Sequence, residues 1–586
     1  MPKPIAKPTS LLVIDVSPVE VHAHLIKQID EFYHWMGVGK APVALTMLGN
    51  IDKRCVLNAL HQLTTHTSCI LLGDDNQVIT PTDKHGRGVD RICVTWSLTT
   101  PLKVVLIGLM PSYSLNVGHR LIAEMPMEII DQITSTDDRS VDERMDTILT
   151  SGAELIVLLG GVDGGADQVI KTQVDLIVRS LSILPQDLRP EVVYAGNSTL
   201  SGYVKSKLEG LTVISTAANI QPTLMDTDLQ PAREVLANVC SRIWLKRFNL
   251  QTGASQLNVD FTRPTINAIE DLVNILAKCE NANNGCVAIY LNSLSTSISA
   301  ILDDRGTSHQ YAKTCRAYGS NTSMSDIKLV DVTSWSPSKI QQIDLVDHLI
   351  GDALYPGRLP VTSTDSAIDQ GVTHTAGRLT WHQLTKKRDF DSRLISKQDG
   401  LDADLILIGG SKLYSRQSLG PVLLEMMDIL QPIGITDVYL DREGVAAPLG
   451  ALAHIDPIIP VHCILGNALL KLATVIAPAF HAKDNSKVMT LVMVNTEGKK
   501  IVHEIQSGSL FSIPLAVDET IEMRIPFRLG VDLGLRSSRR KTFTLTGSAM
   551  GIIVDARGRP LIPRKDPQAQ QAWMKRSLEQ AQELDK

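Results

Sequence analysis

The sequence predicts an α/β protein that ends in a β-rich module. Between residues 101 and 247, short apolar runs alternate with helix-length stretches, which is typical of a parallel sheet with crossover helices. A second segment of this kind begins near Cys286. From about Ser486, short β-like runs follow one another at close spacing, separated by Gly, Pro and Asp, which is typical of antiparallel strands.

Composition is consistent with a large multi-domain protein. The chain has 586 residues, of which 44% are hydrophobic, and its net charge of −6 gives no reason to expect bulk binding to nucleic acid. Its eight cysteines are scattered without a C-x-x-C pair, which indicates buried thiols in a reducing compartment. No signal peptide is visible, and polar residues interrupt the apolar stretch 458–480, which we expect to form a buried helix. We therefore expect a cytoplasmic protein without a transmembrane segment.

The first α/β segment covers residues 11–100. Its first strand is predicted at Leu11–Asp15, where the run LLVID is continuously apolar up to its terminal acid. Further strand candidates, bounded by turn residues, lie at 43–47, 69–72 and 91–96. The pattern indicates a mixed segment that contains hairpins.

The segment 101–247 has the most regular pattern. Strands are predicted at 104–107, 155–159, 192–194 and 211–215, and helices at 114–124, 142–150, 166–184 and 200–208. A further helix runs from Pro231 to about Arg247, because proline is favoured in the first helical turn. Each predicted strand ends in small or polar residues, which should line one edge of a parallel sheet.

A glycine-rich loop follows the apolar run that begins at Leu155, where the sequence reads LIVLLGGVDGGADQVIK. Glycines allow the backbone to turn where a Cβ would clash, and Asp163 can bind exposed amides. Such a loop suits a ligand or partner site, and it equally suits a tight strand-to-helix turn without a ligand. The candidate residues, which include two asparagines at neighbouring strand ends, are Gly161, Asp163, Gly164, Gly165, Asn197 and Asn219.

The second α/β segment begins with a strand at 286–291 and a hairpin return at 293–304. Residues 303–400 are polar and are predicted to be irregular, apart from a helix at 343–354. The elements predicted after them are a strand at 405–408 that ends in Gly409 and Gly410, a helix at 419–430, a strand at 438–440 and a helix entered through 444–452. The last residues, 566–586, are predicted to form an exposed helix.

The string GGVDGGADQVI resembles the G-G-T-D-G-G motif of the glutamate mutase accessory proteins. Similar supporting segments occur in the same order, at 102–114, 192–197, 229–236, 405–413 and 441–453, so the resemblance covers roughly residues 10–460. Members of that family are often encoded beside an adenosylcobalamin-dependent mutase and are proposed to act as its chaperones or reactivating factors.

The resemblance implies the fold of the actin, heat-shock chaperone and sugar-kinase ATPases, in which two α/β lobes close over a nucleotide. The predicted parts are a tail (1–10), the first half of this actin-like core (11–100), a parallel-sheet insertion with the GGVDGG loop (101–247), the second half (248–480), a β-rich C-terminal module (481–565) and a terminal helix (566–586). ATP or ADP with Mg²⁺ would be the implied cofactor.

The first phosphate loop of that superfamily is altered here. It should read D-x-G-[ST]-x-[ST]-K. Asp15 is retained, and it would hold Mg²⁺ and be catalytic if the protein were active. Ser17 replaces the glycine, Pro18 offers no N–H, and Glu20 adds a negative charge near the phosphate.

The second phosphate loop should read D-x-G-G-x-T-T-D. Here it reads YLNSLSTS over 290–297, which keeps only the hydroxyls of Ser295 and Thr296. The implied adenosine side retains Gly409 and Gly410. We therefore predict a degenerate ATPase that has lost hydrolysis, with at most weak nucleotide binding through Ser17, Ser295, Thr296, Gly409 and Gly410.

The function predicted from these features is a non-catalytic accessory, chaperone-like or scaffolding role with a protein partner, such as a cobalamin-dependent mutase. One alternative is an active, ATP-dependent reactivating factor. Another is a structural subunit that self-associates as actin-like folds can. No nucleophile elbow, H-E-x-x-H, Walker lysine loop or G-x-G-x-x-G motif indicates other chemistry.

Two further patterns are ambiguous. His22 and His24 share one side of a possible strand and could bind metal, but no third ligand lies at fixed spacing, so exposed or satisfied histidines are favoured. The basic run RSSRRK at 536–541, together with Arg557 and Arg559, is consistent with a docking surface for an acidic partner or anionic headgroups, or with a solvated hairpin tip.

Overall fold

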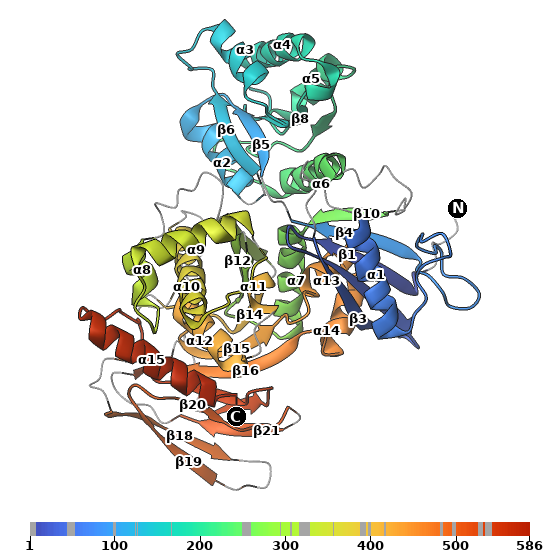
Figure 1. The fold of residues 1–586 in the computed structure, drawn as a ribbon. Coiled ribbons are helices and arrows are strands. Elements are labelled where there is room, and N and C mark those ends of the chain that lie inside the picture. Colours follow the sequence, from blue (N-terminus) through green and yellow to red (C-terminus); the bar gives the residue numbers. More distant parts are fainter. Residues whose placement is uncertain are drawn as a thin grey trace. The chain divides into compact units, whose positions relative to one another are not determined.

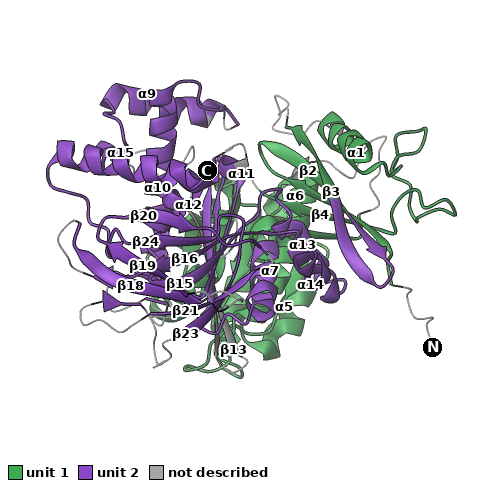
Figure 2. Cartoon of the chain, turned by 90° about the horizontal axis from the view of Figure 1, so that it is seen from below, with its two compact units in different colours: residues 1–25, 37–267 green, residues 26–36, 268–586 purple. Residues whose placement is uncertain are grey.

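The computed structural model divides the chain into two compact units, residues 1–25 with 37–267 and residues 26–36 with 268–586 (Figure 2). The residues that it describes are 7–43, 53–97, 101–123, 125, 127–165, 167–248, 259–293, 295–304, 307–315, 328–355, 357–386, 394–395, 400–414, 418–480, 485–494, 498, 500–517, 519–525, 531–533 and 542–585. Strands and helices together confirm a mixed α/β protein with several sheets.

A five-stranded sheet in the order β10-β4-β1-β2-β3 opens the chain, and the end of β2 and start of β3 belong to the second unit. Its strands are β1 (Ser10–Val16), β2 (Glu20–Ile29), β3 (Phe32–Pro42), β4 (Arg91–Trp96) and β10 (Phe261–Pro264). β1 and β4 are parallel, which places Asp15 opposite Thr95. Helix α1 (Lys53–Thr67), which the sequence did not predict, packs Ala59, Leu60 and Leu63 into the same core as β1.

Two of the strands predicted in this segment are not found as such. Residues 69–72 form only an isolated bridge, between Leu72 and Val78. The candidate at 43–47 lies outside the described residues except for Val43.

The first unit also contains a parallel sheet in the order β6-β5-β7-β8-β9 (Figure 1). Its strands are β5 (Leu102–Ile107), β6 (Met127–Ile133), β7 (Leu155–Leu158), β8 (Glu191–Tyr194) and β9 (Ile214–Thr216). Four of these strands were predicted. The fifth, β6, lies at the edge and is only half-buried, so its sequence lacks the apolar run that marked the others.

Helices cover both faces of this parallel sheet. They are α2 (Asn116–Ala123), which follows a π-helical turn (Pro111–Leu115), α3 (Val141–Thr150), α4 (Asp167–Ile183), α5 (Ser201–Leu208) and α6 (Gln230–Phe248). Val104 and Leu106 face a core shared with α2 and α6, whereas Val105 and Ile107 face a core shared with α3, α4 and α5. The alternation along β5 thus explains why the whole strand is apolar.

The second unit is built on an eight-stranded sheet in the order β13-β12-β11-β14-β15-β16-β24-β20. Its strands are β11 (Cys286–Leu291), β12 (Thr296–Asp304), β13 (Thr307–Cys315), β14 (Leu405–Gly409), β15 (Gly434–Leu440), β16 (Leu470–Ala477), β20 (Leu510–Ile513) and β24 (Ile552–Asp555). β12 returns antiparallel to β11, as the sequence predicted, and β14 pairs parallel with β11.

Two smaller sheets complete the C-terminal part. The first, in the order β19-β18-β21-β23, contains β18 (Lys487–Val494), β19 (Lys500–Gln506), β21 (Thr520–Arg524) and β23 (Thr542–Thr546), and the second pairs β17 (Ala479–Phe480) with β22 (Val531–Asp532). This region is β-rich, as predicted. However, β20 and β24 join the eight-stranded sheet, so the region is continuous with the preceding fold.

The helices of the second unit show where the sequence prediction was wrong. They are α7 (Thr265–Cys279), which starts in the first unit, α8 (Leu329–Ser334), α9 (Gln342–Leu354), α10 (Ser363–Thr385), α11 (Ser411–Tyr414), α12 (Leu419–Leu430), α13 (Ala446–Leu452), α14 (Ile458–Leu465) and α15 (Pro567–Glu583). α10 is a long buried helix within a region predicted to be irregular. The apolar stretch 458–480 is not one helix, because α14 is followed by β16 and β17.

Helix α15 is not a free terminal helix either. Gly420 of α12 lies so close to it that a Cβ there would be 1.9 Å from the carbonyl oxygen of Ala581. Within the described residues, no helix is both long and apolar enough to cross a membrane.

Candidate functional site

The six residues of the predicted glycine-loop set come together at the carboxyl ends of β7, β8 and β9. Asn197, fully buried, organises them. Its Oδ1 accepts the main-chain N–H of Gly164 at 3.1 Å, and its Nδ2 donates to the carbonyl oxygen of Gly165 at 2.7 Å. Because both contacts are to loop backbone, Asn197 fixes the shape of the GGVDGG turn.

Asn219 closes the other side of the loop. Its Nδ2 donates to the carbonyl oxygen of Gly161 and to Oδ1 of Asp163, each at 2.9 Å. The amide of Ser198 also donates to Asp163 Oδ1 at 2.8 Å, and these hydrogen bonds, led by that of Ser198, lower the pKa of Asp163. Asp163 is exposed and ionised, yet it is tied into the loop.

Three backbone amides of the loop are bound by acceptors within the chain. The amide of Gly164 is bound by Asn197, that of Gly165 by the carbonyl of Val162, and that of Asp163 by the carbonyl of Pro222. A phosphate cradle needs N–H groups that point outward, and these three are already used. The loop is a hydrogen-bonded platform, and these three amides do not point outward to an anion.

Exposed apolar side chains flank this platform. Met110 and Tyr113 follow β5 and are each 49% exposed, and Leu224 and Met225, which lie beyond Pro222, are 67% and 93% exposed. Apolar groups of this size gathered at one edge are typical of a protein-binding surface. We call these four residues and the GGVDGG turn the loop edge.

Asp15, the retained acid of the first phosphate loop, is held at the end of β1. Its Oδ1 accepts hydrogen bonds from Thr95 Oγ1 at 2.6 Å and from Thr265 Oγ1 at 3.0 Å. These two hydroxyls orient the carboxylate in the first unit. No other predicted site residue of that unit contacts Asp15 in the hydrogen bonds of the described residues.

Ser17 closes the turn between β1 and β2 on itself. Its Oγ accepts the amides of Val19 at 3.3 Å and Glu20 at 2.9 Å, and it donates to the carbonyl oxygen of Glu20 at 2.8 Å. The Ser17 amide donates to the same carbonyl at 2.9 Å. The donors that could cradle a phosphate here are thus bound by Ser17, and Pro18 supplies none.

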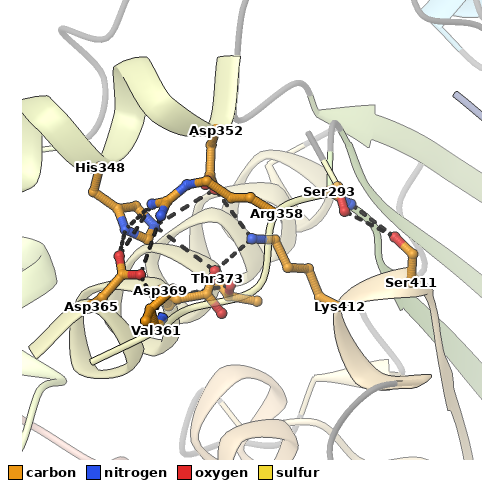
Figure 3. Close-up of polar contacts among 10 residues, drawn as sticks. All are labelled: Ser293, His348, Asp352, Arg358, Val361, Asp365, Asp369, Thr373, Ser411 and Lys412. Atoms are coloured by element: carbon orange, nitrogen blue, oxygen red, sulfur yellow. Dashed lines mark hydrogen bonds and ion pairs between the residues drawn. The ribbon is translucent and has the colours of Figure 1, made fainter. Parts of the chain in front are cut away.

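The second loop and the retained glycine pair are packed against each other in the second unit. Ser411 donates its amide to Asn292 Oδ1 at 3.1 Å. The Oγ of Ser411 accepts the amide of Ser293 at 3.0 Å (Figure 3). A Cβ on Gly410, whose φ is +113°, would lie 2.4 Å from the carbonyl oxygen of Leu291. Gly409 approaches the ring of Tyr290 in the same way. These two glycines therefore allow the backbone at the end of β14 to lie close to β11.

These residues do not fit a bound Mg–triphosphate as they stand. Asp15 is one suitable carboxylate, but the donors around Ser17 and Asn292 are occupied by partners within the chain. Of the other predicted nucleotide residues, Thr296 is buried at the start of β12 and Ser295 forms the turn with Asn292.

A buried polar cluster in the second unit was missed by the sequence prediction. It joins α9, α10 and α11 and consists of His348, Asp352, Arg358, Asp365, Asp369 and Lys412 (Figure 3). Lys412 directly follows Gly409, Gly410 and Ser411. The available signal was the spacing of HLIGD and DSAID, which puts His348 with Asp352, and Asp365 with Asp369, four residues apart on their helices.

The predicted basic surface is wrong for Arg557 and Arg559. Both side chains are fully buried and form ion pairs with Asp555, at 2.9 and 2.7 Å, and Arg557 also reaches Asp428 at 2.7 Å. The two guanidiniums hold the pKa of the Asp555 carboxyl well below its usual range although burial opposes this, whereas burial raises that of Asp428. The run at 536–541 lies outside the described residues.

His22 and His24 lie on β2 but are buried rather than exposed. His22 Nε2 contacts Glu20 Oε2 at 2.8 Å, and burial lowers the pKa of His24 well below its ordinary value. In the described part of the chain, the group of possible metal ligands that comes together is instead His348, Asp352 and Asp369.

Comparison with known proteins gives one sequence-level match and several distant structural ones. The family model described as MutL protein matches residues 11–465. No curated protein matches the chain. A nucleotide-free acetone carboxylase structure is 11% identical with a TM-score of 0.33, covering 85% of this chain and 81% of that one.

Two other structures are similar at the same level. The glycerol kinase of Plasmodium falciparum with ADP is 9% identical with a TM-score of 0.30, covering 79% of this chain and 93% of that one. A glycerol dehydratase reactivase is 8% identical with a TM-score of 0.25, covering 76% of this chain and all of that one.

Proposed function

The chain belongs to the MutL family of glutamate mutase accessory proteins, and on that premise we propose that it is a non-catalytic accessory protein, chaperone-like or scaffolding, which binds a partner enzyme and does not hydrolyse ATP. The partner class is an adenosylcobalamin-dependent mutase. The proposed architecture is a two-lobed actin-like core, with the sheet of β5 to β9 as an insertion.

One observation supports the proposed loss of ATP hydrolysis. The hydroxyl of Ser17 binds the amides of Val19 and Glu20, which occupy the position of the first phosphate loop. A triphosphate would have to break both hydrogen bonds and would then face the carboxylate of Glu20. Removing positioned donors from charge-stabilising sites typically slows a reaction about 100- to 1,000-fold per donor.

The loop edge is the proposed docking surface. Its backbone is fixed by Asn197 and Asn219, so little conformational entropy is lost when a partner binds. Tyr113, Leu224 and Met225 provide apolar and aromatic groups of the kind that dominate protein interfaces. The residues therefore support binding of another protein at this edge.

ATP turnover tests the first part of the proposal. We expect the purified full chain with Mg²⁺ to hydrolyse ATP no faster than its Asp15→Ala variant, and calorimetry to give weak or unmeasurable affinity for ATP and ADP. Robust turnover that Asp15→Ala abolishes would instead establish the active reactivating factor. Sedimentation at high protein concentration separates both from a self-assembling subunit.

Direct binding to a purified glutamate mutase tests the second part. We expect Met225→Asp to weaken binding at least tenfold, because the charge replaces a fully exposed apolar contact. Ile183→Asp is the matched control, since Ile183 is also exposed, at 63%, but lies at the far end of α4. Equal effects of the two substitutions would place the docking surface elsewhere.

A further inference from the structure

His348 is a buried histidine that has a carboxylate beside one ring nitrogen, as metal-binding histidines usually have. His348 is 4% exposed and its Nδ1 lies 2.8 Å from Asp365 Oδ1. Arg358 contacts both groups, with Nη2 at 2.6 Å from this Nδ1 and at 3.2 Å from Asp365 Oδ1. A guanidinium can only donate, so the contacts of Nδ1 with Arg358 and with Asp365 are alternative hydrogen bonds that need different tautomers of His348. In the tautomer whose Nδ1 donates to Asp365, the lone pair of His348 is on Nε2, as is usual for metal-binding histidines beside a carboxylate.

Asp365 is suited to this orienting role. Its Oδ2 accepts hydrogen bonds from Nη1 of Arg358 at 3.2 Å and from the amide of Val361 at 3.0 Å, so the carboxylate is held in place on a second side. Its Oδ1 faces Nδ1 of His348 and can accept the proton of that nitrogen.

The other ring nitrogen faces two buried carboxylates. His348 Nε2 is buried and has no hydrogen-bond partner among the described residues. It lies 3.6 Å from Asp352 Oδ2 and 3.8 Å from Asp369 Oδ1. In a tetrahedral zinc site with bonds near 2.1 Å, ligand atoms are about 3.4 Å apart. The three atoms are thus close to the spacing that one ion requires.

Lys412 supplies the positive charge beside these two carboxylates. Its Nζ contacts Asp352 Oδ2 at 3.1 Å and also Asp369 Oδ1, the two oxygens that face His348 (Figure 3). An ammonium that shares both carboxylates competes with a metal ion for them. The cluster can therefore exchange one cation for another without leaving buried carboxylates unpaired.

We propose that His348 Nε2, Asp352 and Asp369 form a binding site for a divalent transition-metal ion of the zinc class, which enters in exchange for the ammonium of Lys412. Imidazole with carboxylates favours such ions over Mg²⁺. Asp365 acts as a positioning residue. The proposed metal site does not require the proposed loss of ATP hydrolysis or the proposed mutase partner.

The test is metal binding to the full chain after treatment with a chelator. Calorimetry with Zn²⁺ and the visible absorption of Co²⁺ report affinity and coordination, and circular dichroism confirms that each variant is folded. We expect the wild type to bind through His348, so that His348→Gln loses one equivalent of Zn²⁺ and the tetrahedral Co²⁺ bands. Asp365→Asn should weaken binding about 10- to 100-fold.

Lys412→Met separates this proposal from a purely structural ion-pair cluster. Removal of the competing ammonium should tighten Zn²⁺ binding at least tenfold, whether or not the wild type binds measurably. The matched control is Lys471→Met, since Lys471 also pairs with a carboxylate, Asp437, at 3.0 Å on β15, and it should leave the affinity unchanged. The proposal is overturned if Lys412→Met binds no tighter than the wild type, or if His348→Gln keeps the full affinity.

Discussion

The hydroxyl of Ser17 lies 2.9 Å from the amide nitrogen of Glu20, and this hydrogen bond closes the β1–β2 turn, at the position predicted from the sequence for a first phosphate loop. The same oxygen receives the amide of Val19. The turn is thus stabilised by the chain and needs no anion.

Ser17→Ala should destabilise the protein by about 1–2 kcal/mol, because two amides lose their acceptor. Urea denaturation measures the loss. Ser17→Thr, which retains the hydroxyl, should cost clearly less. If alanine and threonine are equally tolerated, the turn is held by other contacts.

Gly410→Ala should destabilise the second unit by about 3 kcal/mol or more, because the new Cβ would meet a backbone oxygen as well as an unfavourable φ. Gly508→Ala is the control in the same unit, since Gly508 has a φ of +83° but open space around it. Its cost should be about 1–2 kcal/mol from the left-handed conformation alone. Equal losses in thermal denaturation would argue against the contact with Leu291.

Asp555→Asn should be among the most damaging polar substitutions, at about 3–5 kcal/mol, because it removes the carboxylate that pairs with the buried guanidinium of Arg559 and leaves that of Arg557 with Asp428. Glu504→Gln breaks the exposed pair with Lys487 and should cost less than about 1 kcal/mol. Denaturant midpoints of the two variants compare them directly. A small loss for Asp555→Asn would show that the buried pairs are compensated elsewhere.

Acidification should destabilise the fold through buried neutral histidines. His374 stacks on Trp335 with 4.2 Å between ring centroids, and burial, followed by the charge of Arg378, lowers its pKa well below the ordinary value. The pKa of His374 in the folded protein lies below its value of about 6.5 in the unfolded chain. The stability that the neutral ring contributes is therefore complete above about pH 6.5 and is lost as the pH falls below that value.

The variant His374→Phe keeps an aromatic ring on Trp335 and cannot be protonated. Between pH 7 and pH 5, we expect its urea midpoint to fall less than that of the wild type. Parallel pH profiles for the two proteins would mean that His374 is already charged in the folded state.

The parallel sheet of the first unit and its loop were predictable because local pattern and topology agree there. Strand ends of a parallel sheet meet at one edge, so glycines and asparagines after β7, β8 and β9 had to converge. Their internal hydrogen bonds could not be predicted, since Asn197 reaches Gly164 across 33 positions of sequence.

The second unit was harder to predict in the regions where polar side chains are buried. Helix α10 buries Asp369, Thr373, His374 and Thr380, which in a sequence indicate an irregular surface segment. Arg557 and Arg559 were assigned to the surface for the same reason, because Asp428, the partner of Arg557, lies 129 positions away. Polar burial of this kind depends on tertiary partners that no local window contains.

Because β24 pairs with β16, the C-terminal part of the chain contributes strands to the eight-stranded sheet. The strand that carries Asp555 lies in the eight-stranded sheet and follows, along the chain, the four-stranded sheet of β19, β18, β21 and β23. Truncation after residue 465, where the family match ends, would remove β16, β24 and β20 from the sheet. Strand β15 would then become an edge strand with exposed apolar side chains and unpaired backbone groups. Shortened versions for structural or biochemical work should therefore retain the chain through α15.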